Sequence, residues 1–426
     1  MAQRIMVVGG GGREHALLWK LAQSPGTSTL LCAPGNAGTA ALAEAVAVRT
    51  TDTDAVVRAA IKQRVDLVVV GPEDPLAAGL ADALVAAGIP TYGPSAAAAR
   101  IESSKAFAKE IMAAAGVPTG RSVTVTTVAD GMTAVSESGL PVVLKADGLA
   151  AGKGVVICAT HDEAQNFLMS MLDDRTLGTA GQSVLVEEFL RGPEISILSL
   201  VDGETIRSLA PARDHKRAFD GDQGPNTGGM GVFAPLPDVD DAMLDRIDRE
   251  VLAPTVREMS ARGIPFRGTL FTGLILTADG PKVLEYNARF GDPETQVTLP
   301  LLDGDLRALL DAVAHGRLAE QPVPVIRDAA AVGVVMASGG YPGPYPTGLP
   351  ITGLGSVPDD VTVFHAGTAL DDTGAVVTAG GRVLTVVGTG PDLATAQERA
   401  YAGVDAIHFD RAHVRRDIAA RAITAD

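Results

Sequence analysis

Glu285 and Asn287 are the two residues whose types and spacing most clearly indicate chemistry. They end the second strand of a segment that predicts a β-hairpin, residues 271–277 and 281–287 around an Asp-Gly turn. Because residues i and i+2 of a strand lie on the same face, their carboxylate and amide oxygens can reach one ion together. With no His or Cys nearby, this oxygen pair suits Mg²⁺ that bridges the phosphates of a nucleotide.

The same segment also contains a cationic residue and apolar residues on the other face of the strand. Arg289 follows the metal pair with a forked guanidinium group, which can hold a carboxylate or a phosphate. Leu284 and Tyr286 are expected on the opposite face of the strand. An ordinary hairpin with one polar face is the alternative, and this segment alone does not decide between them.

Composition sets the broad class of protein. A chain of 426 residues exceeds the size of one hydrophobic core, which predicts two or three domains. The formal charge of −16 argues against binding nucleic acid as a polymer, because that mode needs a basic surface. No apolar run approaches the roughly twenty residues of a membrane span, and no signal peptide precedes the first strand, so a cytoplasmic location is expected. Cys32 and Cys158 lie in apolar strand-like segments and are expected to be buried.

The first hundred residues alternate between strand and helix patterns. Apolar strands that alternate with helices predict a parallel sheet covered on both faces. Ligands of such sheets bind beyond the carboxyl ends of the strands, and glycine-rich or polar clusters fall at three of those ends, at residues 9–15, 34–39 and 71–74. A ligand site is therefore expected there.

The first of these glycine clusters does not match a dinucleotide-binding fingerprint. That motif requires G-x-G-x-x-G, but the last position is Glu14 when counted from Gly9 and His15 when counted from Gly10. Backbone N–H groups at a helix N-terminus can still hold a phosphate. Tight turns are the alternative, although two adjacent clusters favour a phosphorylated ligand.

The middle of the chain carries a second group of polar residues. Lys145 ends a strand, and Lys153 lies in the following loop of small residues, so a triphosphate can be held although the chain lacks a Walker sequence. Glu187 and Glu188 end another apolar strand, with Glu194 shortly after. These acids either form a solvated edge or accept hydrogen bonds from an adenine amine and a ribose.

The chain resembles the glycinamide ribonucleotide synthetases, which are ATP-grasp ligases of purine synthesis. The resemblance covers essentially the whole chain. It rests on motifs in the same order, at residues 11–16, 33–39, 145–154, 214–217, 224–231 and 289–296. One departure is the loop at 341–348, whose added prolines stiffen it.

The resemblance implies an α/β, ATP-grasp fold in three parts. Residues 1–102 would form an N-terminal parallel-sheet domain that binds substrate. Residues 103–327 would form the ATP-grasp domain, with a mobile lid at about 119–192, and residues 328–426 a small C-terminal α/β domain.

The resemblance also implies a role for each matching residue. ATP would be bound by Lys105, Lys145, Gly152, Lys153, Gly154, Glu187, Glu188, Phe189, Leu190 and Glu194. Glycine and 5-phosphoribosylamine would be bound by Gly11, Gly12, Asn36, Gly38, Thr39, Glu73, Asp214, Arg289 and Asp292. Catalysis would fall to Arg289, Lys145 and Asp214, and Glu285 with Asn287 would hold Mg²⁺ or Mn²⁺.

The implied reaction joins glycine to 5-phosphoribosylamine through a glycyl phosphate, with release of ADP and phosphate. The implied partners are these small molecules and ATP, with no nucleic acid or membrane. A monomer is expected, with transient hand-over of the labile amine from an amidophosphoribosyltransferase. Alternatives are a related ATP-grasp carboxylase, a nicotinamide-dependent dehydrogenase and a nucleotide-binding module without activity.

Overall fold

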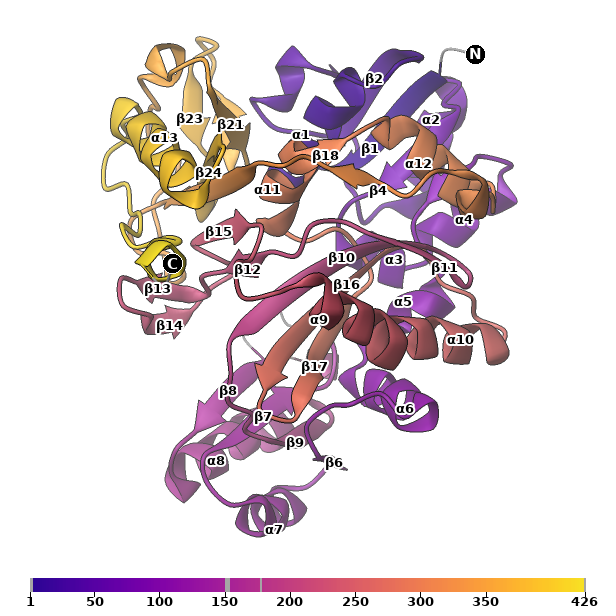
Figure 1. Cartoon of the computed structure of the whole chain (residues 1–426), viewed down its shortest axis with the longest axis vertical. Coiled ribbons are helices and arrows are strands. Elements are labelled where there is room, and N and C mark those ends of the chain that lie inside the picture. The colour runs from indigo at the N-terminus through magenta and orange to yellow at the C-terminus, as the bar shows by residue number, and fades with distance from the viewer. Residues whose placement is uncertain (1–2, 150–153, 177, 425–426) are drawn as a thin grey trace.

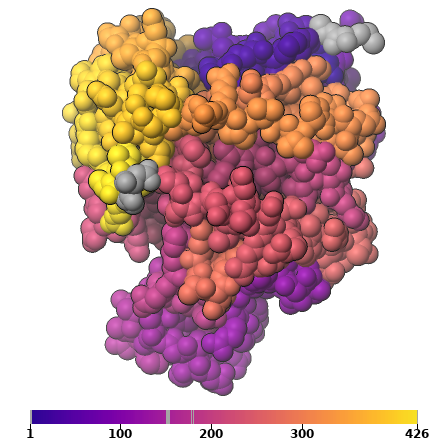
Figure 2. All heavy atoms as spheres, viewed as in Figure 1, coloured from indigo at the N-terminus to yellow at the C-terminus, as the bar shows by residue number. Residues whose placement is uncertain are grey.

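The computed structural model describes residues 3–149, 154–176 and 178–424. The N-terminal sheet and the C-terminal elements form the upper part of the molecule, and one lobe projects below the body (Figure 1). The space-filling view shows this lobe projecting from the lower left of the wider body (Figure 2). None of the described helices is long and apolar enough to cross a membrane.

The N-terminal region is the parallel sheet that the sequence predicts, in the order β3-β2-β1-β4-β5. Its strands are β1 (Gln3–Gly9), β2 (Thr27–Pro34), β3 (Glu44–Ala45), β4 (Leu67–Val70) and β5 (Thr91–Tyr92), and its helices are α1 (Gly12–Ala22), α2 (Thr53–Lys62), α3 (Glu73–Ala77) and α4 (Leu80–Ala86). Alternate residues of β1 enter different cores, because Ile5 packs with the leucines of α1 whereas Met6 packs with α2 and α4. Both faces of the sheet are therefore covered.

The projecting lobe is an antiparallel sheet in the order β6-β9-β7-β8. It contains β6 (Ser122–Val125), α7 (Val128–Ser138), β7 (Val142–Ala146), β8 (Val155–Cys158), α8 (His161–Leu168) and β9 (Val184–Glu188). Its buried side chains form a cluster of their own, which includes Val135, Leu144 and Leu168. A lobe with a separate core can move as a unit, and we call residues 119–192 the lid.

The body below the N-terminal sheet is built on the antiparallel order β11-β10-β16-β17. Its strands are β10 (Glu194–Asp202), β11 (Thr205–Ser208), β16 (Arg267–Thr277) and β17 (Gly280–Asn287), and its helices are α5 (Ala96–Ser103), α6 (Lys105–Ala115), α9 (Asp241–Ile247) and α10 (Ala253–Ala261). A π-helical turn at residues 248–252 joins α9 to α10.

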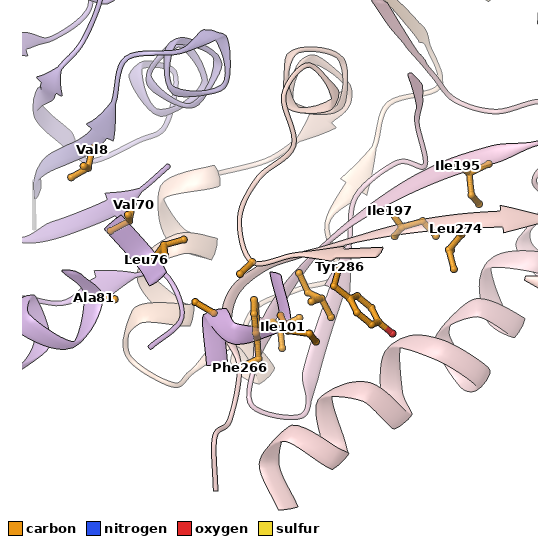
Figure 3. Close-up of a cluster of buried hydrophobic side chains, with 14 of the residues drawn as sticks. Val8, Val70, Leu76, Ala81, Ile101, Ile195, Ile197, Phe266, Leu274 and Tyr286 are labelled. Carbon is orange, nitrogen blue, oxygen red and sulfur yellow. The ribbon is translucent and has the colours of Figure 1, made fainter. Parts of the chain in front are cut away.

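Strands β16 and β17 form the predicted hairpin, with one irregularity. The register shifts between Gly273, which pairs with Glu285, and Leu274, which pairs with Val283, so Leu284 is an extra residue in β17. Tyr286 is 3% exposed and points toward the helix beneath the sheet, where its hydroxyl lies 2.7 Å from Thr255 Oγ1 (Figure 3). Simple alternation along β17, which would place Leu284 with Tyr286, is therefore broken at the extra residue.

The C-terminal sheet has the order β12-β15-β20-β24-β21. It combines β20 (Ala330–Ala337), β21 (Val361–His365) and β24 (Arg382–Gly390) with β12 (Arg213–Asp214) and β15 (Gly231–Ala234) from the middle of the chain. The remaining elements are β13 (Arg217–Phe219), β14 (Gln223–Asn226), α11 (Glu294–Leu301), β18 (Leu302–Asp303), α12 (Leu306–Ala314), β19 (Val325–Ile326), β22 (Thr368–Leu370), β23 (Val376–Thr378), α13 (Leu393–Ala406) and α14 (Ala420–Thr424). Asp214 is thus held by a sheet that crosses the proposed domain boundary at 327/328.

Candidate active site

Two lysines meet where the lid joins the body. Lys145 Nζ, from β7, donates to Leu284 O on β17 at 2.9 Å and forms an ion pair with Glu187. Lys105 Nζ, from the first turn of α6, donates to Ala146 O and Gly148 O, both at 2.9 Å. Within the described part of the chain, these partners take two of the three N–H donors of each lysine, so each ammonium group retains a donor for a ligand.

Glu187 has a different environment from the one that the sequence suggests. Its side chain is only 2% exposed and lies between Lys145 and Lys109, a lysine of α6. Both of its oxygens therefore face protein cations. The carboxylate neutralises buried lysines, which explains why an acid can be buried at this position.

The residues after Glu187 form the exit from β9. Glu188 Oε2 accepts from the backbone N–H of Arg121 at 3.2 Å, and this bond is the leading cause that lowers the Glu188 pKa. Phe189 lies beneath the guanidinium of Arg191, and Phe189 and Leu190 are both partly exposed. Gly154 O accepts from Ala146 N at 2.7 Å, whereas Gly152 and Lys153 lie outside the described residues.

Glu285 lies among four cations. Burial alone would raise its pKa, but Lys216, Lys145, Lys105 and Arg289 together hold the pKa of this carboxyl below its ordinary value. Glu285 is therefore ionised at neutral pH, as a metal ligand must be.

Behind Glu285 is a second group of acids around Lys216. Lys216 Nζ lies 2.9 Å from Glu194 Oε2, and despite burial its pKa is held well above the ordinary value by Asp214, Glu194 and Glu285. Burial and the neighbouring Asp214 raise the pKa of Glu294 to about 7. Ser196 Oγ is 3.4 Å from Glu294 Oε1. This group of carboxyls suits an ammonium ion or an amine.

Arg289 is largely committed to protein partners. Its Nε lies 3.1 Å from Glu73 Oε2, and its Nη2 lies 3.1 Å from Glu102 Oε1 and 3.2 Å from Asn287 Oδ1. Its Nη1 donates to Phe290 O at 3.3 Å. Three of its five N–H donors thus donate hydrogen bonds, and Glu102 adds an ion pair. The sequence identifies a forked cation that can hold a carboxylate or a phosphate, and the structure shows that much of this fork already faces protein partners.

The donor set at β17 fits a hard cation that a nucleotide helps to hold. Glu285 is an ionised carboxylate and Asn287 offers an amide oxygen, which are ligands that Mg²⁺ and Mn²⁺ accept. Across residues 3–149, 154–176 and 178–424, no group of three or more His, Cys, Asp or Glu side chains is arranged to hold a metal ion. A pair of protein ligands is typical of Mg²⁺, which keeps waters and substrate phosphates as its other ligands.

The glycine cluster after β1 is occupied by the chain itself. Glu14 Oε2 accepts from Gly11 N at 2.6 Å, and Asp292 Oδ2 accepts from Arg13 N at 3.4 Å. A Cβ at Gly9, whose φ is +129°, would lie 2.6 Å from the Glu14 carboxyl carbon. Two carboxylates therefore already satisfy the N-terminus of α1. The N–H of Gly11 therefore has a partner within the chain, and a substrate role of Gly11 stays a prediction.

The second glycine cluster joins two domains. Asn36 Nδ2 donates to Gly10 O at 2.9 Å and to His365 O at 2.7 Å, and its Oδ1 accepts from the backbone N–H groups of Gly38 and Thr39. All four hydrogen-bonding positions of the Asn36 side chain are thus used. The sequence predicts a substrate ligand here, but the structure shows a side chain that fixes the N-terminal sheet to β21.

Thr39 and the histidines complete this junction. Thr39 is 2% exposed, and its Oγ1 donates to Asn36 O at 2.9 Å. A Cβ at Gly38 would lie 2.5 Å from atoms of both His15 and His365, so these rings pack directly on the glycine. Gly12 is similarly close to Gln296 of α11. The cluster at 34–39 therefore has a structural role in addition to any role in binding.

Three residues near the site are missed by the sequence reasoning. Lys109 lies one helical turn after Lys105, Glu102 contacts Arg289, and Arg382 lies 3.4 Å from Asp292 through its Nη2. Only Lys109 has a sequence signal, because an i,i+4 pair of lysines on one helix shares a face. Arg382 also donates to Gly228 O, which ties the 224–231 loop to the C-terminal sheet.

Buried neutral histidines predict a pH-dependent stability. Burial lowers the pKa of His15 to about 3, and of His215 and His365 to about 4. Each takes up a proton on unfolding below its ordinary pKa, so its contribution to stability is present above about pH 6.5 and is lost as the pH falls.

Between pH 6 and 4.5, we expect the free energy of unfolding to fall less steeply with pH in His15→Gln than in the unmodified protein. The two slopes should differ by up to one proton, which is about 1.4 kcal/mol per pH unit. Urea unfolding at a series of pH values measures this slope. Burial raises the pKa of Glu102 and Glu294 to about 7, so these two groups make the protein more stable as the pH falls. They do so in both the variant and the unmodified protein, and the difference between the two slopes therefore reports on His15. An unchanged slope would contradict the burial of a neutral ring.

Comparison with protein-family models finds three matches in order along the chain. They are the phosphoribosylglycinamide synthetase N domain at residues 3–102, the ATP-grasp (A) domain at 103–295 and the C domain at 331–421.

Curated relatives cover the same length. The phosphoribosylamine–glycine ligase of Streptomyces coelicolor is 51% identical over 426 residues, which are 99% of this chain and 100% of that protein. The trifunctional purine biosynthetic protein adenosine-3 of Gallus gallus is 50% identical over 99% of this chain, which spans 42% of that longer protein.

Solved structures agree with the sequence matches. The crystal structure of the phosphoribosylamine–glycine ligase of Thermotoga maritima superposes with a TM-score of 0.84 at 33% identity, over 97% of this chain and 100% of that chain. A biotin carboxylase from Campylobacter jejuni superposes with a TM-score of 0.75 at 16% identity, over 97% and 93% of the two chains. The second likeness concerns the fold alone.

Proposed function

The chain belongs to the phosphoribosylglycinamide synthetase family, and from that premise we infer how its residues carry out the reaction of a phosphoribosylamine–glycine ligase. The enzyme joins glycine to 5-phosphoribosylamine with hydrolysis of ATP, and the product is glycinamide ribonucleotide. This is the second step of purine synthesis de novo. The expectation of a ligase is confirmed.

Charged side chains from the lid, α6 and the hairpin lie close together, and this observation supports the roles that we assign. Lys105 and Lys145 each retain a donor, and both lower the pKa of Glu285 across the junction. Cations that surround an ionised metal ligand form the arrangement that a triphosphate with its metal requires. We therefore place the ATP phosphates between these lysines and β17, and the adenine against residues 188–190.

The chemistry needs an activated acid. Carboxylate is a poor electrophile, so ATP transfers its terminal phosphoryl group to the carboxylate of glycine and ADP leaves. The amine of phosphoribosylamine then attacks the acyl carbon, and phosphate leaves as the new amide bond forms. Phosphoryl transfer depends mostly on positioning and charge neutralisation, which Lys145 and Arg289 supply in this proposal.

The acidic residues near Glu285 indicate where glycine binds. We propose that Asp214 and Glu294 recognise the ammonium group of glycine, because Glu294 is buried, Asp214 is half-buried and the Asp214 carboxyl raises the pKa of Glu294. Glu73 positions Arg289 at 3.1 Å rather than meeting the substrate directly. The substrate roles of Gly12, Gly38 and Asp292 remain proposals that rest on the family resemblance.

Glu285 and Asn287 would hold Mg²⁺ or Mn²⁺, which would neutralise charge on the phosphates. The lid would exclude water from the acyl phosphate, since its separate core allows it to close as a unit. We also propose a monomer in the cytoplasm that receives its labile amine from an amidophosphoribosyltransferase. A rate benefit from adding that enzyme would support the hand-over.

Release of ADP tests the function directly. With phosphoribosylamine generated in the assay, we expect ADP formation only when glycine is also present. Omission of either substrate is the matched control, since it leaves ATP and metal unchanged. Formation of ADP with bicarbonate and another ribonucleotide would instead indicate an ATP-grasp carboxylase.

A further inference from the structure

Lys109 occupies the centre of the junction between lid and body without contacting the place assigned to the nucleotide. Its Nζ donates to Thr119 Oγ1 at 2.8 Å and to Gly120 O at 2.9 Å, and it forms an ion pair with Glu187. A lysine has three N–H donors, so all of them are used by the protein. Lys109 is thus not available as a phosphate ligand, unlike Lys105 on the preceding turn of α6.

The contacts of Lys109 reach three elements that shape the site. Glu187 belongs to the lid strand β9, and Thr119 and Gly120 form the entry to the lid. Thr119 Oγ1 in turn donates to Val283 O on β17 at 2.7 Å, two residues before Glu285. Helix α6 lies where the lid joins the body (Figure 1). Lys109 therefore connects α6, the lid and the hairpin that carries the metal pair.

Glu187 is shared between Lys109 and Lys145. One carboxylate faces two ammonium groups, so the group of three carries a net charge of about +1. Without Lys109, the whole negative charge of Glu187 would act on Lys145, and the net charge beside the nucleotide would fall to zero. In a buried site that change is weakly screened by solvent.

We propose that Lys109 is a positioning residue for ATP, which balances Glu187 so that the group keeps its net positive charge and Lys145 keeps its remaining donor for the phosphates. This inference rests on the proposed ATP site between Lys145 and β17. It explains why two lysines on one face of α6 have different partners. It also assigns Glu187 an indirect role, because its carboxylate orients lysines rather than meeting the ribose or the adenine.

A double-mutant cycle distinguishes this charge balance from a packing role. We expect Lys109→Met to weaken ATP binding about tenfold or more and to leave adenosine binding unchanged, because only the phosphates meet Lys145. The double variant Lys109→Met with Glu187→Gln removes one charge of each sign and restores the net +1. It is therefore expected to bind ATP more tightly than Lys109→Met alone.

Calorimetric titration of the full-length protein with MgATP and, separately, with adenosine measures both affinities. Lys62→Met, an exposed lysine at the end of α2, is the matched control. If Lys109→Met does not fold, Lys109→Gln tests the same point, since it removes the charge but retains a side chain able to donate to Gly120. An equal loss for ATP and adenosine, or a double variant weaker than the single one, would overturn the proposal. Failure of the unmodified protein to bind ATP would instead refute the proposed function.

Discussion

Glu285→Gln is expected to lower turnover by about 10³-fold or more while the protein remains folded. The substitution keeps the shape of the side chain but removes the negative charge that faces Lys105, Lys145, Lys216 and Arg289. Only neutral amide oxygens, at positions 285 and 287, are then left as protein ligands, so the metal that accompanies the nucleotide would lose its charged partner. Initial rates of ADP release, measured as a function of Mg²⁺ and Mn²⁺ concentration, check the prediction.

The control for this experiment lies on the same hairpin. Asp279 is exposed at the turn between β16 and β17, so Asp279→Asn removes the same charge at the far end of the strands. We expect this variant to keep its rate and its metal dependence. Binding of Mn²⁺ in the presence of ATP, followed by electron paramagnetic resonance, gives a readout that does not depend on turnover. Normal turnover of Glu285→Gln would remove the metal assignment.

Arg289→Lys is the second substitution with a large expected effect, a loss of about 10²- to 10³-fold in kcat. Lysine keeps the positive charge but cannot bridge Glu73, Glu102 and Asn287, which the guanidinium holds together at 3.1 to 3.2 Å. The charge therefore moves from the position that these partners fix. Steady-state kinetics with each substrate varied in turn measures the effect.

The pattern of kinetic change identifies what Arg289 contacts. Because protein partners hold much of the guanidinium group, we expect a loss in kcat with little change in the KM for glycine, which indicates the transferring phosphoryl group. A rise in the KM for glycine with unchanged kcat would indicate the substrate carboxylate instead. Arg257, which is 69% exposed, provides the control Arg257→Lys. Thermal unfolding of both variants separates a catalytic loss from the destabilisation expected when Glu102 loses its guanidinium partner.

Local patterns in the sequence predict most elements of the fold. The hairpin expected at 271–277 and 281–287 lies within β16 and β17, and the N-terminal strands form the parallel sheet that their alternation with helices predicts. These features depend on the period of apolar residues, on caps and on turns, which are properties of neighbouring positions. The extra residue in β17 has no such signal, because register depends on the partner strand.

The identity of the active-site residues is only partly a local property. The spacing of Glu285 and Asn287 is visible in the sequence, and so are the ordered motifs by which the chain resembles the family that the comparisons find. The partners of these residues are not visible, since Lys109 and Glu187 are 78 positions apart and Asn36 and His365 are 329 apart. Sequence spacing gives no distance between such residues.

The sequence by itself therefore determined the type of chemistry and the segment for which we propose a metal pair, because ligand type and strand spacing are properties of consecutive residues. Only the tertiary structure decided which charged groups remain available to a ligand. It places Glu14 in the glycine turn, commits the fork of Arg289 to Glu73 and Glu102, and uses every hydrogen-bonding position of Asn36 at a domain junction. The physical reason is that a buried polar group must find partners, and packing rather than spacing selects them.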